Sequence, residues 1–478
     1  MGLVTSYLAK MLSAGIITTT LLCCQTQPAR GGSADRPISF AAAWQQLLAE
    51  NDTLAAARAN VEMTAHKQHA ARDLYLPEIA ISTSYLYLDD EVTLSPADIL
   101  ESMPAGDQLA PVIAGLSKSY GRSMEEINRG LTSTIAERDN LTSSIRAQWP
   151  IYTGGRMRAA QDIAAGQLGE AGQHLKMKEE EQFENLARYY FGVVLSKTIL
   201  DTRVDVEAGL QKHRDHALLL EEQGQIAKVE RMQAEASFDK AVVERRKAGR
   251  DLQIARLALT RMLKSTTTVI PADALFINDT LPPLTSFLDK TLTDYPGLGI
   301  LDAKKEQATG LLAVEKGKYL PTVALFGNYS LYEEDDLATT LLPDWVVGVG
   351  VNIPLLERSG RSGKLKAAKS MVTQLNALQA QARSDLSVLV EKSYRQAEQA
   401  LEEYNGLGSS LELARETINL RTKAFSQGLS TSLDVVDAEL FLAGIRTQRA
   451  VALYNYVVTL AKLTAISGEP ESFLVYQH

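Results

Sequence analysis

Residues 54–88 read LAAARANVEMTAHKQHAARDLYLPEIAISTSYLYL, and residues 298–332 repeat this pattern 244 positions later without a gap. Both copies change their hydrophobic period at a proline, Pro77 in the first and Pro321 in the second. Before the proline the composition is that of a helix, whereas after it apolar residues alternate with small or polar ones, as in a strand. Because proline cannot continue a helix and disfavours helix in the residue before it, each copy predicts a helix that leads into a strand.

The composition limits the classes of function. A chain of 478 residues with an internal duplication favours two halves of one architecture over unrelated modules. The formal net charge is −9 and no basic stripe is present, so we expect no nucleic-acid partner. After the N-terminal segment, no apolar run is long enough to predict a transmembrane helix.

Residues 1–34 have the pattern of a secretory signal peptide. Lys10 precedes an apolar core from Met11 to Cys24, and small and polar residues follow as far as Ala34. We expect cleavage after Ala34, and lipid attachment at Cys23 or Cys24 is the alternative. The chain has only 2 cysteines, both in this segment, so the exported body contains no disulfide in either case.

The first structural repeat is expected at residues 35–264. It contains a helix from Phe40 to about Leu74, a strand ending at Leu88, a long polar loop over 89–140 and a second strand over 141–151. The loop contains a helical piece between Pro111 and Glu137. A helix over 156–223 follows, which would be roughly 100 Å long at 1.5 Å per residue. Gly224 separates it from another helix over 228–263.

The second repeat, 284–467, has the same order of elements. Gly224 corresponds to Gly428 and Glu235 to Glu439 at an offset of 204 residues, and a fourth strand alternates over 345–353. We expect residues 265–283 to form a linker against the outside of the helices and residues 468–478 to form a C-terminal tail.

All four predicted strands have one apolar or aromatic face and one small or polar face, which is typical of membrane-spanning barrel strands. Four strands cannot close a barrel, and open edges are not tolerated in lipid, so neighbouring chains must complete it. Three chains would supply twelve strands and leave a lumen. The residues expected to face lipid are Ile81, Tyr85, Ile145, Val347 and Val349, and those expected to face the lumen are Ser82, Ser84, Arg146, Gln148 and Asn352. Two soluble hairpins packed on helices are the alternative.

Short motifs recur at the element boundaries. They are Leu76-Pro77 and Leu320-Pro321 before the odd-numbered strands, 150–155 (PIYTGG) and 354–357 (PLLE) after the even ones, and 224–226 (GQI) with 233–235 (QAE) and 428–430 (GLS) with 433–438 (LDVVDA) at the helix turns. With this order and spacing, the sequence from Ile38 to Ser467 resembles the TolC family of outer-membrane efflux and secretion channels.

The resemblance implies a mainly α-helical fold with a membrane β-barrel. Three chains would form a twelve-stranded barrel in the outer membrane of a Gram-negative bacterium and a long α-helical tunnel in the periplasm. Such a homotrimer exports small molecules or proteins as the outer component of a tripartite efflux or type I secretion system. Its partners would be a periplasmic adaptor (membrane fusion) protein, an inner-membrane RND or ABC pump and outer-membrane lipid, and no cofactor is implied.

The resemblance also implies functional residues near the helix turns. Asp434 and Asp437, at i and i+3 on one helix face, match acidic positions that line the periplasmic aperture. Their alternative role is that of ordinary acids at a helix start. Glu230 matches an acid that helps to close the aperture in some members. Gly224 and Gly428 would be the hairpin tips that contact the adaptor.

The expected partners of Glu230 are not basic or tyrosyl in this chain, because the matching positions are Ser430 and Phe425. A charge-paired lock is therefore not predicted, and a closed state would depend on packing or on other bonds. The absence of a basic residue at Ser430 also predicts that Asp434 and Asp437 do not form salt bridges.

Other candidate sites are weak. The pairs His66/His69 and His213/His216 have i,i+3 spacing, but without a third ligand they indicate solvated polar positions rather than a metal site. No nucleophile motif or phosphate-binding loop is present, so no enzymatic activity and no metal site are expected. A periplasmic coiled-coil scaffold without a pore is the alternative function.

Overall fold

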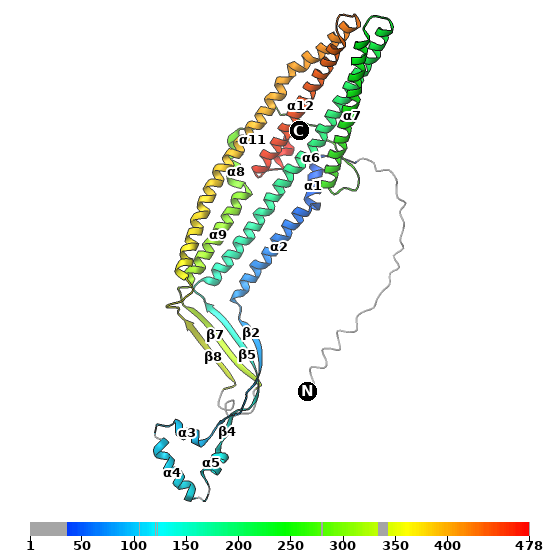
Figure 1. Ribbon diagram of the computed structural model, residues 1–478. Coiled ribbons are helices and arrows are strands. Elements are labelled where there is room, and N and C mark those ends of the chain that lie inside the picture. Colours follow the sequence, from blue (N-terminus) through cyan, green and yellow to red (C-terminus); the bar gives the residue numbers. More distant parts are fainter. Residues whose placement is uncertain are drawn as a thin grey trace, which may run out of the picture.

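The computed structural model describes residues 36–104, 106–119, 121, 123–278, 281–332 and 343–477. The expected signal peptide and both cysteines lie outside these residues. Long helices run side by side along most of the molecule, a four-stranded sheet continues from one end of them, and a small helical unit lies beyond the sheet (Figure 1).

The first half follows the predicted order of elements. It consists of β1 (Arg36–Ile38), α1 (Phe40–Glu50), α2 (Asp52–Arg72), the short 3-10 helix η2 (Asp73–Tyr75), β2 (Glu78–Tyr87), β3 (Val92–Leu94), α3 (Pro96–Ser102), α4 (Gly106–Ser119), α5 (Met124–Leu131), β4 (Ser133–Ala136), β5 (Asp139–Tyr152), α6 (Arg156–Glu222) and α7 (Lys228–Met262). Helix α6 has 67 residues, which corresponds to a length of roughly 100 Å.

The second half repeats this order with shorter connections. It consists of β6 (Val269–Pro271), α8 (Leu284–Asp294), α9 (Pro296–Gly317), β7 (Thr322–Tyr332), β8 (Trp345–Asn352), α11 (Arg361–Ser426), α12 (Ser432–Ile466) and α13 (Ser472–Tyr476). Pro77 and Pro321 each lie between a helical segment and the following strand, which confirms the predicted change of period.

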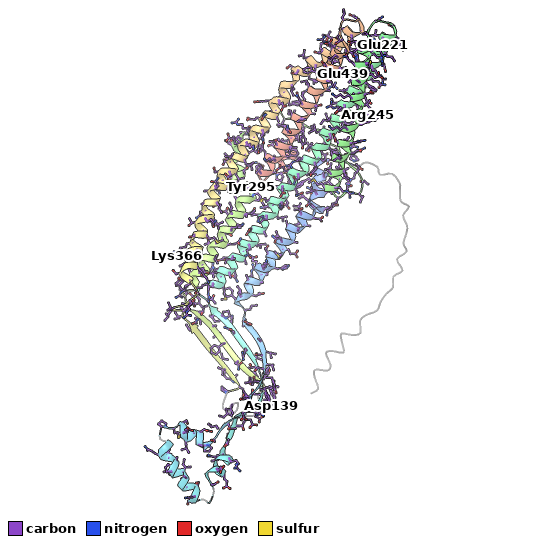
Figure 2. The ribbon with its side chains drawn as sticks, in the orientation of Figure 1. Asp139, Glu221, Arg245, Tyr295, Lys366 and Glu439 are labelled. Atoms are coloured by element: carbon purple, nitrogen blue, oxygen red, sulfur yellow. The ribbon has the colours of Figure 1, made fainter. Side chains whose placement is uncertain are left out.

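The helix predicted from Phe40 to about Leu74 is divided in the structure. Asn51 has an extended conformation (φ −72°, ψ 124°) that separates α1 from α2, and its side chain accepts a hydrogen bond from the N–H of Leu54. Tyr295, labelled in Figure 2, separates α8 from α9 with φ −60° and ψ 121°. Asparagine is a favoured N-cap, and a residue before proline avoids helix, so two different local causes produce the same break at equivalent positions.

The sheet has the order β2-β5-β7-β8, and all its neighbouring strands are antiparallel. One cross-strand row consists of Ile81, Ile145, Tyr329 and Trp345. The next row consists of Ala80, Arg146, Asn328 and Val346. Since successive residues alternate between faces, the two predicted residue sets occupy opposite faces. The apolar face is uncovered, with Ile81 and Val347 each 69% exposed.

The main core lies near the middle of the helical part. Aromatic side chains from α1, α6, α13 and the segment between β6 and α8 pack mostly edge to face with ring centroids 5.1–6.1 Å apart, as in the pairs Trp44–Phe183 and Phe191–Phe276. Strand β6 pairs in parallel with β1, and Val269 is fully buried. Part of segment 265–283 therefore belongs to the core, and only part of it lies on the outside.

The insertion between β2 and β5 forms a small unit of its own. Strands β3 and β4 pair in antiparallel fashion, and helices α3, α4 and α5 lie between them, whereas the sequence indicated one helical piece between Pro111 and Glu137. Ser95 with Asp98 and Ser123 with Glu126 form capping boxes that begin α3 and α5. None of the described helices is both long and apolar enough to span a membrane.

Candidate functional site at the helical tips

Helices α6 and α7 form a first long hairpin, and α11 and α12 form a second. Both hairpins reverse direction at the end of the molecule opposite the sheet, and we call these ends the tips (Figure 1). Gly224 and Gly428 have φ values of +68° and +72°, which strain any residue with a side chain. The N–H of Gln225 donates to the carbonyl of Leu220 at 2.8 Å, and the N–H of Leu429 donates to that of Ala424 at 2.9 Å. These bonds satisfy carbonyl groups at the ends of α6 and α11.

Asp434 is held in a capping box at the start of α12. Its Oδ2 atom accepts hydrogen bonds from the N–H and hydroxyl of Thr431 at 2.9 and 2.7 Å, and from the Ser430 hydroxyl at 3.0 Å. These bonds, above all that from the Thr431 backbone, lower the pKa of Asp434 to about 2.

The prediction that neither aspartate forms a salt bridge is wrong for Asp434. Arg421 of α11 places Nη1 at 3.4 Å from Asp434 Oδ1. Arg421 and Asp434 lie at similar distances along the chain on either side of the Gly428 turn. Counting outward from that turn would have identified the pair, because residues at equal distances from a tight reversal face each other.

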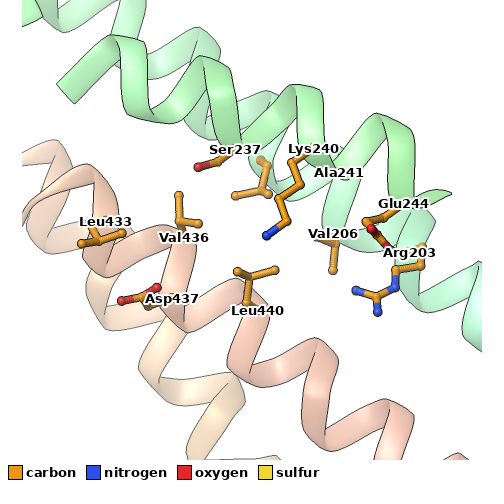
Figure 3. Close-up of a pocket in the computed structure, with 11 residues that line it drawn as sticks. Arg203, Val206, Ser237, Lys240, Ala241, Glu244, Leu433, Val436, Asp437 and Leu440 are labelled. Atoms are coloured by element: carbon orange, nitrogen blue, oxygen red, sulfur yellow. The ribbon is translucent and has the colours of Figure 1, made fainter. Parts of the chain in front are cut away.

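Asp437 has different surroundings. It is exposed and lines a cavity of about 430 Å³ between α6, α7 and α12. Figure 3 shows its side chain at the edge of this cavity, with Lys240 pointing into it and Arg203 and Glu244 at the other end. The two aspartates share a helix but not a common partner.

Glu230 connects the two hairpins. Its Oε2 atom accepts a hydrogen bond of 2.7 Å from the backbone N–H of Ser432, the first residue of α12. A carboxylate is favourable there because helix N-termini carry unpaired N–H groups and a partial positive charge. Glu230 therefore contacts the main chain of the second hairpin, in place of the basic or tyrosyl side chain that the family resemblance implies.

His213 contacts the same serine from α6. Its Nε2 atom lies 2.7 Å from Ser432 Oγ, its side chain is 5% exposed, and the Phe425 ring packs against it at a centroid distance of 4.5 Å. Burial, with a smaller contribution from nearby His216, lowers the pKa of His213 to about 4. The interpretation of His213 as a solvated residue is therefore wrong.

The sequence contained a signal for this burial. His213 continues a stripe of buried apolar residues on α6 with alternating spacings of four and three: Val206, Leu210, Ala217 and Leu220. His66, in contrast, is exposed on α2, and its Nε2 lies 3.8 Å from Glu62. Among the described residues, no group of three or more potential metal ligands gathers.

Comparisons with known proteins agree with this architecture. The sequence matches the family model described as outer membrane efflux protein over residues 43–264 and 288–469. A search of curated proteins finds no match.

Solved structures of similar fold include CusC, with a TM-score of 0.72 and 14% identity over 93% of this chain and 96% of that chain. The outer membrane channel CmeC of Campylobacter jejuni has a TM-score of 0.68 and 13% identity, with coverages of 92% and 89%. The open state of the MtrE outer membrane channel of Neisseria gonorrhoeae has a TM-score of 0.69 and 17% identity, with coverages of 90% and 89%.

Proposed function

The chain belongs to the outer membrane efflux protein family, and we propose that three copies assemble into one channel with a complete β-barrel in the outer membrane of a Gram-negative bacterium. The channel exports small molecules or proteins as the outer component of a tripartite efflux or type I secretion system. The TolC-like arrangement of strands and helices supports this proposal.

The observation that carries it is the sheet. Its apolar face is uncovered, and among the described residues the outer edges of β2 and β8 have no partner strand. An open edge in lipid leaves backbone groups unpaired, at a cost of several kcal/mol each, so the edges require strands from other chains. Pairing β8 of one copy with β2 of the next closes a twelve-stranded barrel in a trimer. A periplasmic scaffold without a pore would not require an uncovered apolar face on the sheet.

The long helices extend the channel from the sheet toward the inner membrane. Helices α6 and α11 have 67 and 66 residues, so each is roughly 100 Å long. They point away from the sheet, and their tips bear the turns at Gly224 and Gly428. We assign these tips to contact with a periplasmic adaptor, which links the channel to an RND or ABC pump.

The tip contacts support a gate at the periplasmic end. Glu230 and His213, one from each helix of the first hairpin, both bind Ser432 of the second hairpin. Separation of the hairpins within one chain breaks both bonds. We assign the closed state to these bonds at the start of α12, and within the part of the chain that the structure describes Glu230 forms no ion pair with the second hairpin.

Asp434 and Asp437 are the proposed acids of the aperture. In a trimer they amount to six carboxylates around one axis, which attract cations. Arg421 partly neutralises Asp434, so most of the effective negative charge belongs to Asp437.

Membrane fractionation followed by planar-bilayer recording tests the channel function. A heat-dissociable trimer from the outer-membrane fraction that conducts ions supports it. A soluble monomer without conductance contradicts it and favours the scaffold.

A further inference from the structure

The polar face of the sheet contains a hollow of about 480 Å³, which is separate from the site at the helical tips. Its walls come from β2, β5 and β7 and include Glu78, Arg146, Gln148, Phe326 and Asn328. Gln148 pairs across the strands with Glu78 and Phe326, and Arg146 pairs with Asn328, so these side chains lie in two adjacent rows of one face. The hollow lies in the half of the sheet nearest the helices.

Arg146 carries the only positive charge on these strands. The other charged residues of β2, β5, β7 and β8 are Glu78, at the start of β2, and Asp139, at the opposite end of the sheet (Figure 2). Arg146 is exposed, and within the described chain no carboxylate forms an ion pair with it. A guanidinium with free donors binds a carboxylate through two parallel hydrogen bonds.

Phe326 supplies an aromatic ring to the same hollow. Its ring lies across β8 at two glycines, because a Cβ atom on Gly348 would approach Phe326 Cζ to 2.5 Å and one on Gly350 would lie 3.9 Å from Cδ1. Gly348 thus leaves the space over β8 that the ring occupies, while 47% of the phenylalanine remains exposed. An exposed aromatic face in this position allows another ring to stack on it.

We propose that this hollow binds aromatic monocarboxylates on their way through the barrel. The carboxylate pairs with Arg146, the aromatic ring stacks on Phe326, and the amides of Gln148 and Asn328 accept or donate further hydrogen bonds. Glu78, at the rim nearest the helices, repels a second negative charge and disfavours dianions. The transport role of the site depends on the proposed channel function, but all the binding residues come from one chain.

Binding is measured by the fluorescence anisotropy of 2-naphthoate, titrated with the purified full-length protein in dodecyl maltoside. We expect saturable binding to the natural protein, about tenfold or more weaker in Arg146→Gln, because the charge-assisted bonds are lost. Phe326→Leu keeps an apolar side chain without the ring and should weaken binding about fivefold. Arg129→Gln, which removes an exposed cation of α5 outside the hollow, should leave the affinity unchanged.

The uncharged analogue 2-naphthylmethanol separates this site from partition into detergent. It should bind equally weakly to the natural protein and to Arg146→Gln. Equal 2-naphthoate affinity in Arg146→Gln and the natural protein overturns the site, even if the same preparation forms a conducting trimer. Loss of 2-naphthoate affinity in Arg146→Gln supports the site, even if the preparation proves monomeric and non-conducting, a result that would contradict only the channel function.

Discussion

Replacing Glu230 with alanine should shift the channel toward its open state. The variant removes the carboxylate that accepts a 2.7 Å hydrogen bond from the N–H of Ser432, and Ser432 itself is fully buried. Without an acceptor, this N–H group remains unpaired at the start of α12. His213 still holds the Ser432 side chain, so the two hairpins lose one of two bonds at this residue.

The magnitude follows from the chemistry of the bond. A hydrogen bond to a charged group contributes roughly 1.5–3 kcal/mol, and about 2 kcal/mol changes an equilibrium about 30-fold. If the three copies open together, the shift is about 6 kcal/mol. A difference of about 5.5 kcal/mol moves a two-state equilibrium from 1:99 to 99:1, so an almost closed channel should become almost fully open.

Single-channel recording in planar bilayers measures this shift as open probability. Glu230→Gln, which keeps a neutral acceptor, should give an intermediate value. Glu235→Ala is the matched control, because Glu235 is exposed on the same helix and, among the described residues, its side chain binds Arg231 of that helix and no residue of the second hairpin. If Glu230→Ala and Glu235→Ala have the same open probability, the bond to Ser432 does not hold the closed state and the proposed gate is wrong.

Four further predictions concern the sheet and the tips. Val349→Arg places a charge on the apolar face, where Val349 is 62% exposed, and should destabilise the trimer by about 2–4 kcal/mol in heat-dissociation gels; an unchanged trimer would argue against a membrane position. Asp437→Asn should reduce cation preference, measured as reversal potential in a salt gradient, more than Asp434→Asn does, because Arg421 already pairs with Asp434; equal effects would contradict this assignment. The pKa of His213 is 6.5 when unfolded and about 4 when folded, so the unfolded state binds more protons between these values and tip stability should fall as pH decreases from 6.5 to 4; His213→Gln should abolish this slope in hydrogen exchange of α6, and a retained slope would show another cause. Gly428→Val introduces a branched residue at φ +72° and should weaken adaptor docking while leaving the sheet intact; normal efflux at equal expression would refute this role.

Local sequence features predicted most of the architecture. The change of period at Pro77 and Pro321 located two strands, and the glycines at 224 and 428 located the two helix reversals. The division at Asn51 was not predicted, because the apolar pattern continues through it and asparagine is tolerated within helices. The insertion over 89–138 was also underestimated, since short capped helices such as α3 and α5 produce only a turn or two of periodicity.

The division between what sequence and tertiary structure determined follows from the range of the interactions. Helix and strand periods, turns and the two faces of each strand depend on neighbours within a few residues, so the sequence alone determined them. The roles of Glu230 and His213 could not be obtained in this way, because Ser432 lies 202 and 219 residues away from them along the chain. Their partner is a main-chain N–H in one case and a buried hydroxyl in the other. Only the packing of α6, α7 and α12 brings these groups within hydrogen-bonding distance.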